Sequence, residues 1–218
     1  MARSKHRRKS KSRNNPHSHY PGEKFQGERF GPDFTKLSKI EIHDDQPGDL
    51  HPEVESRLRA SLAYLRHGNG SKAEQVLREA IEIDPNNPAL LNNLAKALGL
   101  QAKRAEAEAL TFEIQRRFPK YAFGHINAAL ILIEKNEHDR AREILNSLLD
   151  RKRLHFAEFS AMAAAQIKLA LALGHRDKAE HWLELMKQVD PEDPNLKPLQ
   201  ALVRPSLFNL FHRLRSIG

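Results

Sequence analysis

Histidine is the side chain of this sequence best suited to holding a metal or moving a proton at neutral pH. The chain contains twelve histidines and no cysteine. His17 and His19 are two residues apart and His175 and His181 are six apart, but no HExxH or comparable ligand spacing occurs. The lack of cysteine excludes disulfides, a thiolate nucleophile and Cys-ligated zinc or iron–sulfur sites. We therefore predict no metal site and solvated or partly packed histidines.

Other catalytic signatures are missing from the sequence as well. It contains neither the GxSxG turn that presents a nucleophilic serine nor the GxxxxGK[ST] loop that cradles phosphates. We predict a non-enzymatic protein that needs no cofactor.

Basic residues are concentrated at the start of the chain. Of the 36 lysines and arginines, seven lie within residues 1–13, which contain no acid, so the rest of the chain is nearly neutral despite a net charge of +8. Such a segment attracts polyanions with a salt-sensitive affinity. The alternative is a solvated charge run, because no regular series of aromatic residues for base stacking accompanies it. The predicted polyanion-binding residues, including a second basic cluster, are Arg3, Lys5, Arg7, Arg8, Lys9, Lys11, Arg13, Arg151, Lys152 and Arg153.

The first fifty residues are predicted to form a disordered basic tail and linker. They are rich in proline and glycine and poor in aliphatic residues, so they bury too little surface to offset the entropy of ordering. Phe25, Phe30 and Phe34 fit either a segment that docks on the folded part or on a partner, or an ordinary linker.

From residue 51 onward the sequence repeats itself. Ala73, Ala107 and Ala141 are equally spaced, at an interval of about 34 residues. Pro85 and Pro119 each follow their alanine by twelve positions. Pro191 likewise follows Ala179 by twelve, but Ala179 comes four positions later than the same interval would place it. Four units fit this pattern, at about 54–87, 88–121, 122–155 and 160–193, with the extra residues in the loop DRKRLHFAEF.

The repeat resembles the tetratricopeptide family, whose period is about 34 residues with two helices per unit. Tyr64 matches its first-helix tyrosine, Gly68 and Gly174 its interhelical turn, and Leu77, Leu145 and Leu183 the large apolar position of its second helix. The family's first-helix Trp and Gly are missing. The resemblance covers about residues 52–194 and implies an all-α, right-handed superhelical solenoid. Other solenoids of helical hairpins are the alternative.

The spacing of apolar residues predicts four helix pairs: 52–66 with 70–83, 87–99 with 103–117, 121–135 with 138–151, and 156–173 with 176–189. Residues 195–218 are predicted to close the last unit as a capping helix, because a solenoid needs a polar cover at its end. Within them, Leu207, Leu210, Leu214 and Ile217 share one helical face. A basic amphipathic helix of this kind could also lie on a membrane surface.

In tetratricopeptide arrays the first helices of successive units line a concave groove that holds a partner segment. The matching positions combine amides, lysines and an apolar wall, which suits a peptide held by its backbone and one apolar side chain. The alternative for Asn93 and Asn127 is that they satisfy neighbouring turns. The partner-binding residues that the resemblance implies are Leu62, Asn92, Asn93, Lys96, Phe123, Ile126, Asn127, Leu130 and Lys168.

The longest apolar run, around residues 128–133, is far shorter than the roughly 18 residues of a membrane span, and the start lacks the apolar segment of a secretory signal. We expect a cytoplasmic protein. The leading function is a scaffold or adaptor that holds a protein or peptide of unknown identity in its groove. The alternatives are a factor associated with RNA or ribosomes through its basic tail, and an auxiliary subunit of an enzyme complex.

Overall fold

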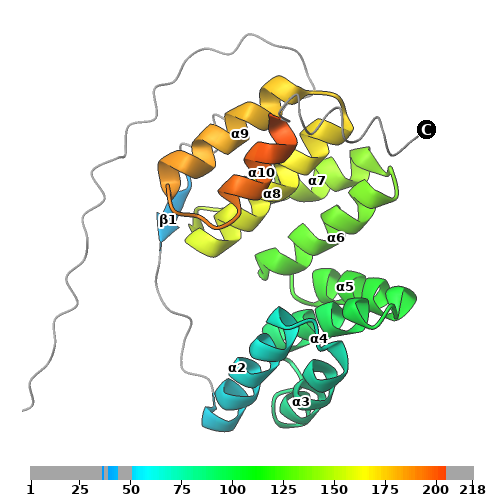
Figure 1. Ribbon diagram of the computed structural model, residues 1–218. Helices are drawn as coiled ribbons and strands as arrows, with labels where there is room; N and C mark the ends of the chain where they lie inside the picture. The colour runs from blue at the N-terminus through cyan, green and yellow to red at the C-terminus, as the bar shows by residue number, and fades with distance from the viewer. Residues whose placement is uncertain (1–35, 37–38, 44–50, 205–218) are drawn as a thin grey trace, which may run out of the picture.

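The computed structural model describes residue 36, residues 39–43 and residues 51–204 (Figure 1). Consecutive helices pair into hairpins, which form four units: α2 with α3, α4 with α5, α6 with α7, and α8 with α9. The helices are α2 (Pro52–Arg66), α3 (Gly70–Ile83), α4 (Pro88–Leu100), α5 (Arg104–Arg117), α6 (Ala122–Glu134), α7 (His138–Leu148), α8 (Phe156–Ala172), α9 (Arg176–Val189) and α10 (Leu196–Val203).

The all-α solenoid predicted from the sequence is confirmed, and each predicted helix is present. The helix starts follow from capping chemistry. Asn69 and Asn87 accept hydrogen bonds from backbone N–H groups at the starts of α3 and α4, and proline occupies the first position of α2 and α4. The largest difference concerns α7, which was predicted to reach residue 151 but ends at Leu148.

The turn inside each hairpin has one residue with a left-handed backbone. These residues are Gly68 (φ 70°), Ala102 (φ 59°), Asn136 (φ 60°) and Gly174 (φ 77°). They recur at the interval of the repeat, and the extra residues of the third unit fall between Asn136 and Gly174. Glycine adopts this conformation without strain and asparagine tolerates it, whereas alanine does not.

Ala102→Gly is therefore expected to stabilise the chain by about 0.5–1 kcal/mol, because it removes the left-handed strain at a small entropic cost. The same change at Ala109, which is exposed in the middle of α5, is expected to destabilise by about 1 kcal/mol. Urea unfolding of both variants checks the prediction. Equal effects of the two substitutions would contradict it.

The helices form an inner and an outer layer. Each first helix contacts the next one, so that α2, α4, α6 and α8 form a continuous row. The second helices α3, α5, α7 and α9 make no such contacts with one another in the described part of the chain. The row whose members approach each other is the inner side of a curved stack. The predicted partner-binding residues all lie on this inner row.

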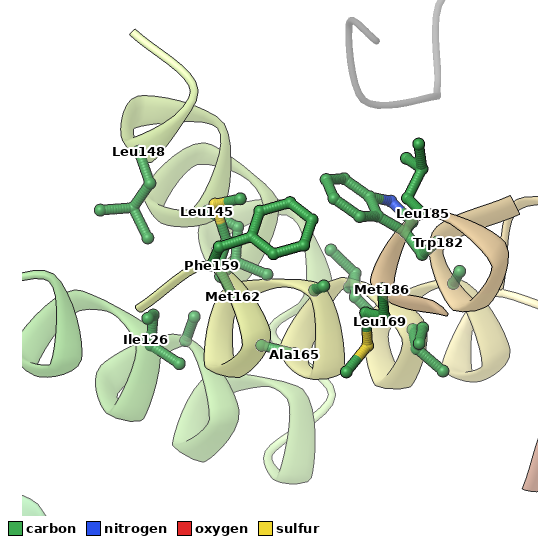
Figure 2. Close-up of a cluster of buried hydrophobic side chains, with 14 of the residues drawn as sticks. Ile126, Leu145, Leu148, Phe159, Met162, Ala165, Leu169, Trp182, Leu185 and Met186 are labelled. Atoms are coloured by element: carbon green, nitrogen blue, oxygen red, sulfur yellow. The ribbon is translucent and has the colours of Figure 1, made fainter. Parts of the chain in front are cut away.

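The apolar core is divided into two clusters. One cluster contains Val54, Leu77, Leu90 and Leu98 and belongs to units 1 and 2. The other runs through units 3 and 4 to α10 and surrounds the fully buried Trp182 (Figure 2). We call these the first and second core clusters. Small residues such as Ala129 and Ala163 let α6 and α8 approach closely inside the second cluster.

Part of the segment predicted to be a disordered tail belongs to the folded unit. Strand β1 (Glu41–His43) pairs in parallel with β2 (Arg153–His155), with Ile42 opposite Leu154. Ile40 is 9% exposed and packs in the second core cluster. The prediction of disorder for all of residues 1–50 is therefore wrong for residues 39–43. Disorder was predicted because residues 1–50 contain few aliphatic side chains. That argument does not hold for residues 39–43, where two isoleucines alternate with polar residues.

Helix α10 packs on α9 and α8, as the predicted cap requires. Leu199 and Val203 are buried in the second core cluster. The amphipathic stretch predicted around Leu207 to Ile217 lies outside the described residues. Within the described part, no helix is both long and apolar enough to cross a bilayer.

Candidate partner-binding face

Four residues at equivalent repeat positions form a row across the inner helices. Leu62, Lys96 and Leu130 follow one another at the interval of the repeat, and Lys168 follows after the longer third unit. Leu62 is 41% exposed, both lysines are exposed, and Leu130 is half-buried. We call this row the inner stripe. It alternates an apolar side chain with a cation from unit 1 to unit 4.

The two lysines of the inner stripe have no carboxylate partner among the described residues. Lys96 is the only charged residue of α4, and Lys168 is the only basic residue of α8. Lys96 is exposed at the surface, but the protein around it removes part of its hydration and lowers its pKa, because desolvation disfavours the ammonium form. A carboxylate brought next to Lys96 would therefore replace lost hydration.

Four arginines of the outer helices show the contrasting pattern. Arg78, Arg104, Arg117 and Arg140 each form an ion pair with a carboxylate one turn away on the same helix or at its cap. Charge neutralised in this way offers little to a partner. The lysines of the inner stripe differ from these arginines in being available to a carboxylate from outside.

The predicted amides lie together but are less accessible than the lysines. Asn127 Nδ2 donates a hydrogen bond to Asn92 Oδ1 at 2.6 Å, which links α6 to α4. Asn92 is 4% exposed and Asn93 7%, whereas Asn127 is half-buried. This bond uses the Oδ1 acceptor of Asn92 and one Nδ2 donor of Asn127. Because Asn127 is also the least buried of the three amides, it is the one best placed to meet a partner.

The two other apolar residues predicted at the face differ in position. Phe123 is half-buried, packs on the second core cluster and lies 5.7 Å from the Tyr121 ring, centroid to centroid. Ile126 is 1% exposed and belongs to the core. The structure therefore removes Ile126 from the contact set, because a partner cannot touch it while the core stays packed. Helical spacing alone did not distinguish this core residue from the half-buried residues near it on α6, such as Asn127 and Leu130.

The predicted basic cluster in the long loop is largely engaged inside the fold. Arg151 donates to the carbonyl oxygens of Lys120 and Pro119, at 2.9 and 3.1 Å, and burial lowers its pKa. Arg153 Nε lies 3.3 Å from Glu41 Oε2. Lys152 and Arg153 are both exposed. The seven basic residues predicted from Arg3 to Arg13 lie outside the described residues.

A small cavity lies between α7, α8 and α9. Its volume is about 20 Å³, which holds about one water molecule. Gln166 Nε2 and Asn146 Oδ1 line it as a buried donor and a buried acceptor without a protein partner. Both groups line a space that fits one water molecule. Across the described ranges, no three His, Asp or Glu side chains gather as a metal site would require.

Comparisons with known proteins agree with the repeat architecture. A family model described as the tetratricopeptide repeat matches residues 54–97. The chain is 31% identical over 93 residues to the TPR repeat-containing thioredoxin TTL4 of Arabidopsis thaliana; the match covers 43% of this chain and 14% of the length of that relative. A solved structure of pilF from Pseudomonas aeruginosa superposes with a TM-score of 0.57 at 18% identity, covering 74% of this chain and 71% of the other. At that identity the likeness concerns the fold alone.

Fold and inner face together define a solenoid of stacked helical hairpins, whose inner helices carry two exposed lysines without a carboxylate partner among the described residues. Residues 54–97 match the tetratricopeptide repeat, and the described chain has the fold of such repeats, as the sequence predicted. Proteins of this family are generally protein-interaction scaffolds.

Proposed function

We propose that this protein is a non-enzymatic scaffold that holds an acidic segment of a partner protein along its inner stripe. The observation that carries the proposal is the pair of exposed lysines, Lys96 and Lys168, which have no carboxylate within the described structure. Leu62 and Leu130 alternate with them and supply apolar contacts. A partner that alternates apolar and acidic side chains complements this surface.

The spacing of the helices suggests how such a segment lies. Packed helices are roughly 8–10 Å apart, and a polyproline II chain advances about 9 Å in three residues. One partner residue in three would therefore meet successive positions of the inner stripe. This favours a segment with an apolar or acidic residue at every third position, crossing the helices rather than following one of them.

A binding titration tests the proposal. The probes are synthetic peptides with Leu and Glu alternating at every third position, prepared in both chain directions, and the same peptides with Gln in place of Glu. Fluorescence anisotropy with the full chain measures the dissociation constant. We expect the Glu peptide of one direction to bind, and the double variant Lys96→Glu, Lys168→Glu to weaken it by about tenfold or more.

A matched variant separates the inner stripe from general charge attraction. Lys187 and Lys197 are exposed on α9 and α10 and have no carboxylate partner among the described residues. Changing both to Glu alters the net charge equally and should leave the dissociation constant within about threefold. If the two double variants weaken binding to the same degree, or if the Gln peptide binds as tightly as the Glu peptide, the proposal fails.

A further inference from the structure

Three segments from different parts of the chain meet at one edge of the array, where loops join successive units. We call them the basic edge, and they are residues 36 and 39–43, residues 116–121 at the end of α5, and residues 150–155 before α8. Arg151 donates hydrogen bonds to the carbonyl oxygens of Lys120 and Pro119, at 2.9 and 3.1 Å. Glu41 N–H donates to the carbonyl oxygen of Lys152 at 2.8 Å, next to the β1–β2 ladder (Figure 1).

The basic edge contains many more cations than carboxylates. The first segment has two lysines, and each of the other two segments has three basic residues, against two acidic residues in all. Both acidic residues are already paired. Glu41 pairs with Arg153 at 3.3 Å, and Lys36 Nζ lies 2.6 Å from Asp150. The basic edge therefore keeps a surplus of positive charge.

Four exposed cations account for this surplus. Lys39, Arg116, Lys120 and Lys152 have no carboxylate partner among the described residues. The hydrogen bonds of Arg151 bring the backbone of Lys120 next to that of Lys152. The bond from Glu41 brings Lys39, two residues earlier, to the other side of Lys152. The surplus charges therefore lie close together.

The neighbouring loops of the array carry the opposite charge. Asp84 lies in the loop after unit 1, and Asp190 and Glu192 lie in the loop after unit 4. The positive charge is thus confined to the part of the edge that units 2, 3 and 4 share. A site of this extent suits a few successive phosphates rather than a large anionic surface.

A single-stranded nucleic acid fits the basic edge better than a membrane does. Half-buried Phe118 lies within it, with the Arg117 guanidinium 5.1 Å from its ring centroid, and unpaired bases stack on such aromatic and guanidinium planes. A membrane-binding surface would also need exposed apolar side chains. Among the described residues, the large apolar side chains that are exposed all lie outside the basic edge: Leu62, Ile83, Leu100 and Leu202.

We propose that the basic edge binds the phosphates of a single-stranded nucleic acid without sequence specificity. The four exposed cations contact the phosphates and release their counterions. The basic edge shares no residue with the inner stripe, so the two sites can be tested separately.

Salt-dependent binding tests the proposal. The probe is a fluorescent oligouridylate of about 20 nucleotides, and anisotropy with the full chain gives its affinity at several salt concentrations. The edge variant carries Lys39→Gln, Arg116→Gln, Lys120→Gln and Lys152→Gln. We expect the slope of log affinity against log salt to become shallower by about 3, because each phosphate contact of a single strand contributes about 0.7. The single variants Lys120→Gln and Lys152→Gln should each change the slope by about 0.7.

A matched variant removes four exposed lysines elsewhere. It carries Lys96→Gln, Lys168→Gln, Lys187→Gln and Lys197→Gln, which also have no carboxylate partner among the described residues. Its slope should change by less than about 1, and the basic residues of 1–13 are the same in every variant. Equal losses in the two fourfold variants, or an unchanged slope in the edge variant, would overturn the proposal. So would a parent chain that binds a duplex of the same length, or phosphatidylserine vesicles, as tightly as the single strand.

Discussion

Leu77→Ala and Leu145→Ala are each expected to destabilise the protein by about 2–5 kcal/mol, but in different halves. Both leucines are fully buried at equivalent positions of the second helix, in units 1 and 3. Loss of a buried leucine side chain removes its transfer free energy and leaves a cavity. Leu77 lies in the first core cluster and Leu145 in the second, which also contains Trp182 (Figure 2).

The chain's one tryptophan makes the two halves distinguishable. Trp182 fluorescence follows unfolding of units 3 and 4, whereas far-UV circular dichroism follows all units. Leu145→Ala should lower the fluorescence midpoint in urea. Leu77→Ala should shift the first part of the dichroism change and leave the fluorescence midpoint close to that of the parent, because units of a repeat protein couple only to their neighbours. Coincident fluorescence and dichroism transitions in Leu77→Ala would show that the two clusters unfold as one.

Much of the fold could be predicted because each unit repeats the same local signals. Spaced alanines recur in register in all four units, prolines follow the second helices of units 1, 2 and 4, and large leucines mark units 1, 3 and 4; together they identify the hairpins and their order. The extra residues of the third unit were predicted in the loop between the third and fourth helix pairs, and the loop between α7 and α8 is longer than the loops after α3 and α5. What they form, strand β2, could not be predicted, because a short strand is ordered only by its partner, and β1 lies far away in the chain, before the first unit of the array.

The candidate face was less predictable than the fold. Repeat position indicates which side of a helix a residue occupies, but not how closely the next helix covers it. Ile126 and Leu130 are one turn apart on α6, yet Ile126 is buried and Leu130 is partly accessible. The hydrogen bond between Asn92 and Asn127 likewise depends on the distance between α4 and α6, which no local pattern determines.

Glu74 is expected to stabilise the contact between units 1 and 2 at neutral pH and to lose this effect in acid. Lys103, Gln101 and Arg78 donate hydrogen bonds to its carboxylate at 2.6 to 2.9 Å. These donors, Lys103 first, lower its pKa from 4.5 to about 2. A lowered pKa in the folded state means stability that is fully present above the ordinary pKa of 4.5 and lost as the pH falls toward about 2.

Glu74→Gln should therefore destabilise the chain by about 2 kcal/mol at pH 7, a value reduced for the solvent exposure of Lys103 and Arg78. The difference from the parent should shrink steadily below pH 4.5 and fall to about a quarter of its pH 7 value at pH 2.5, as measured by urea unfolding at each pH. Glu113→Gln is the control, because among the described residues Glu113 has only the exposed pair with Arg117, and it should change stability by less than about 0.5 kcal/mol. If the loss in Glu74→Gln stayed the same from pH 7 to pH 2.5, the ionised carboxylate would not be its source.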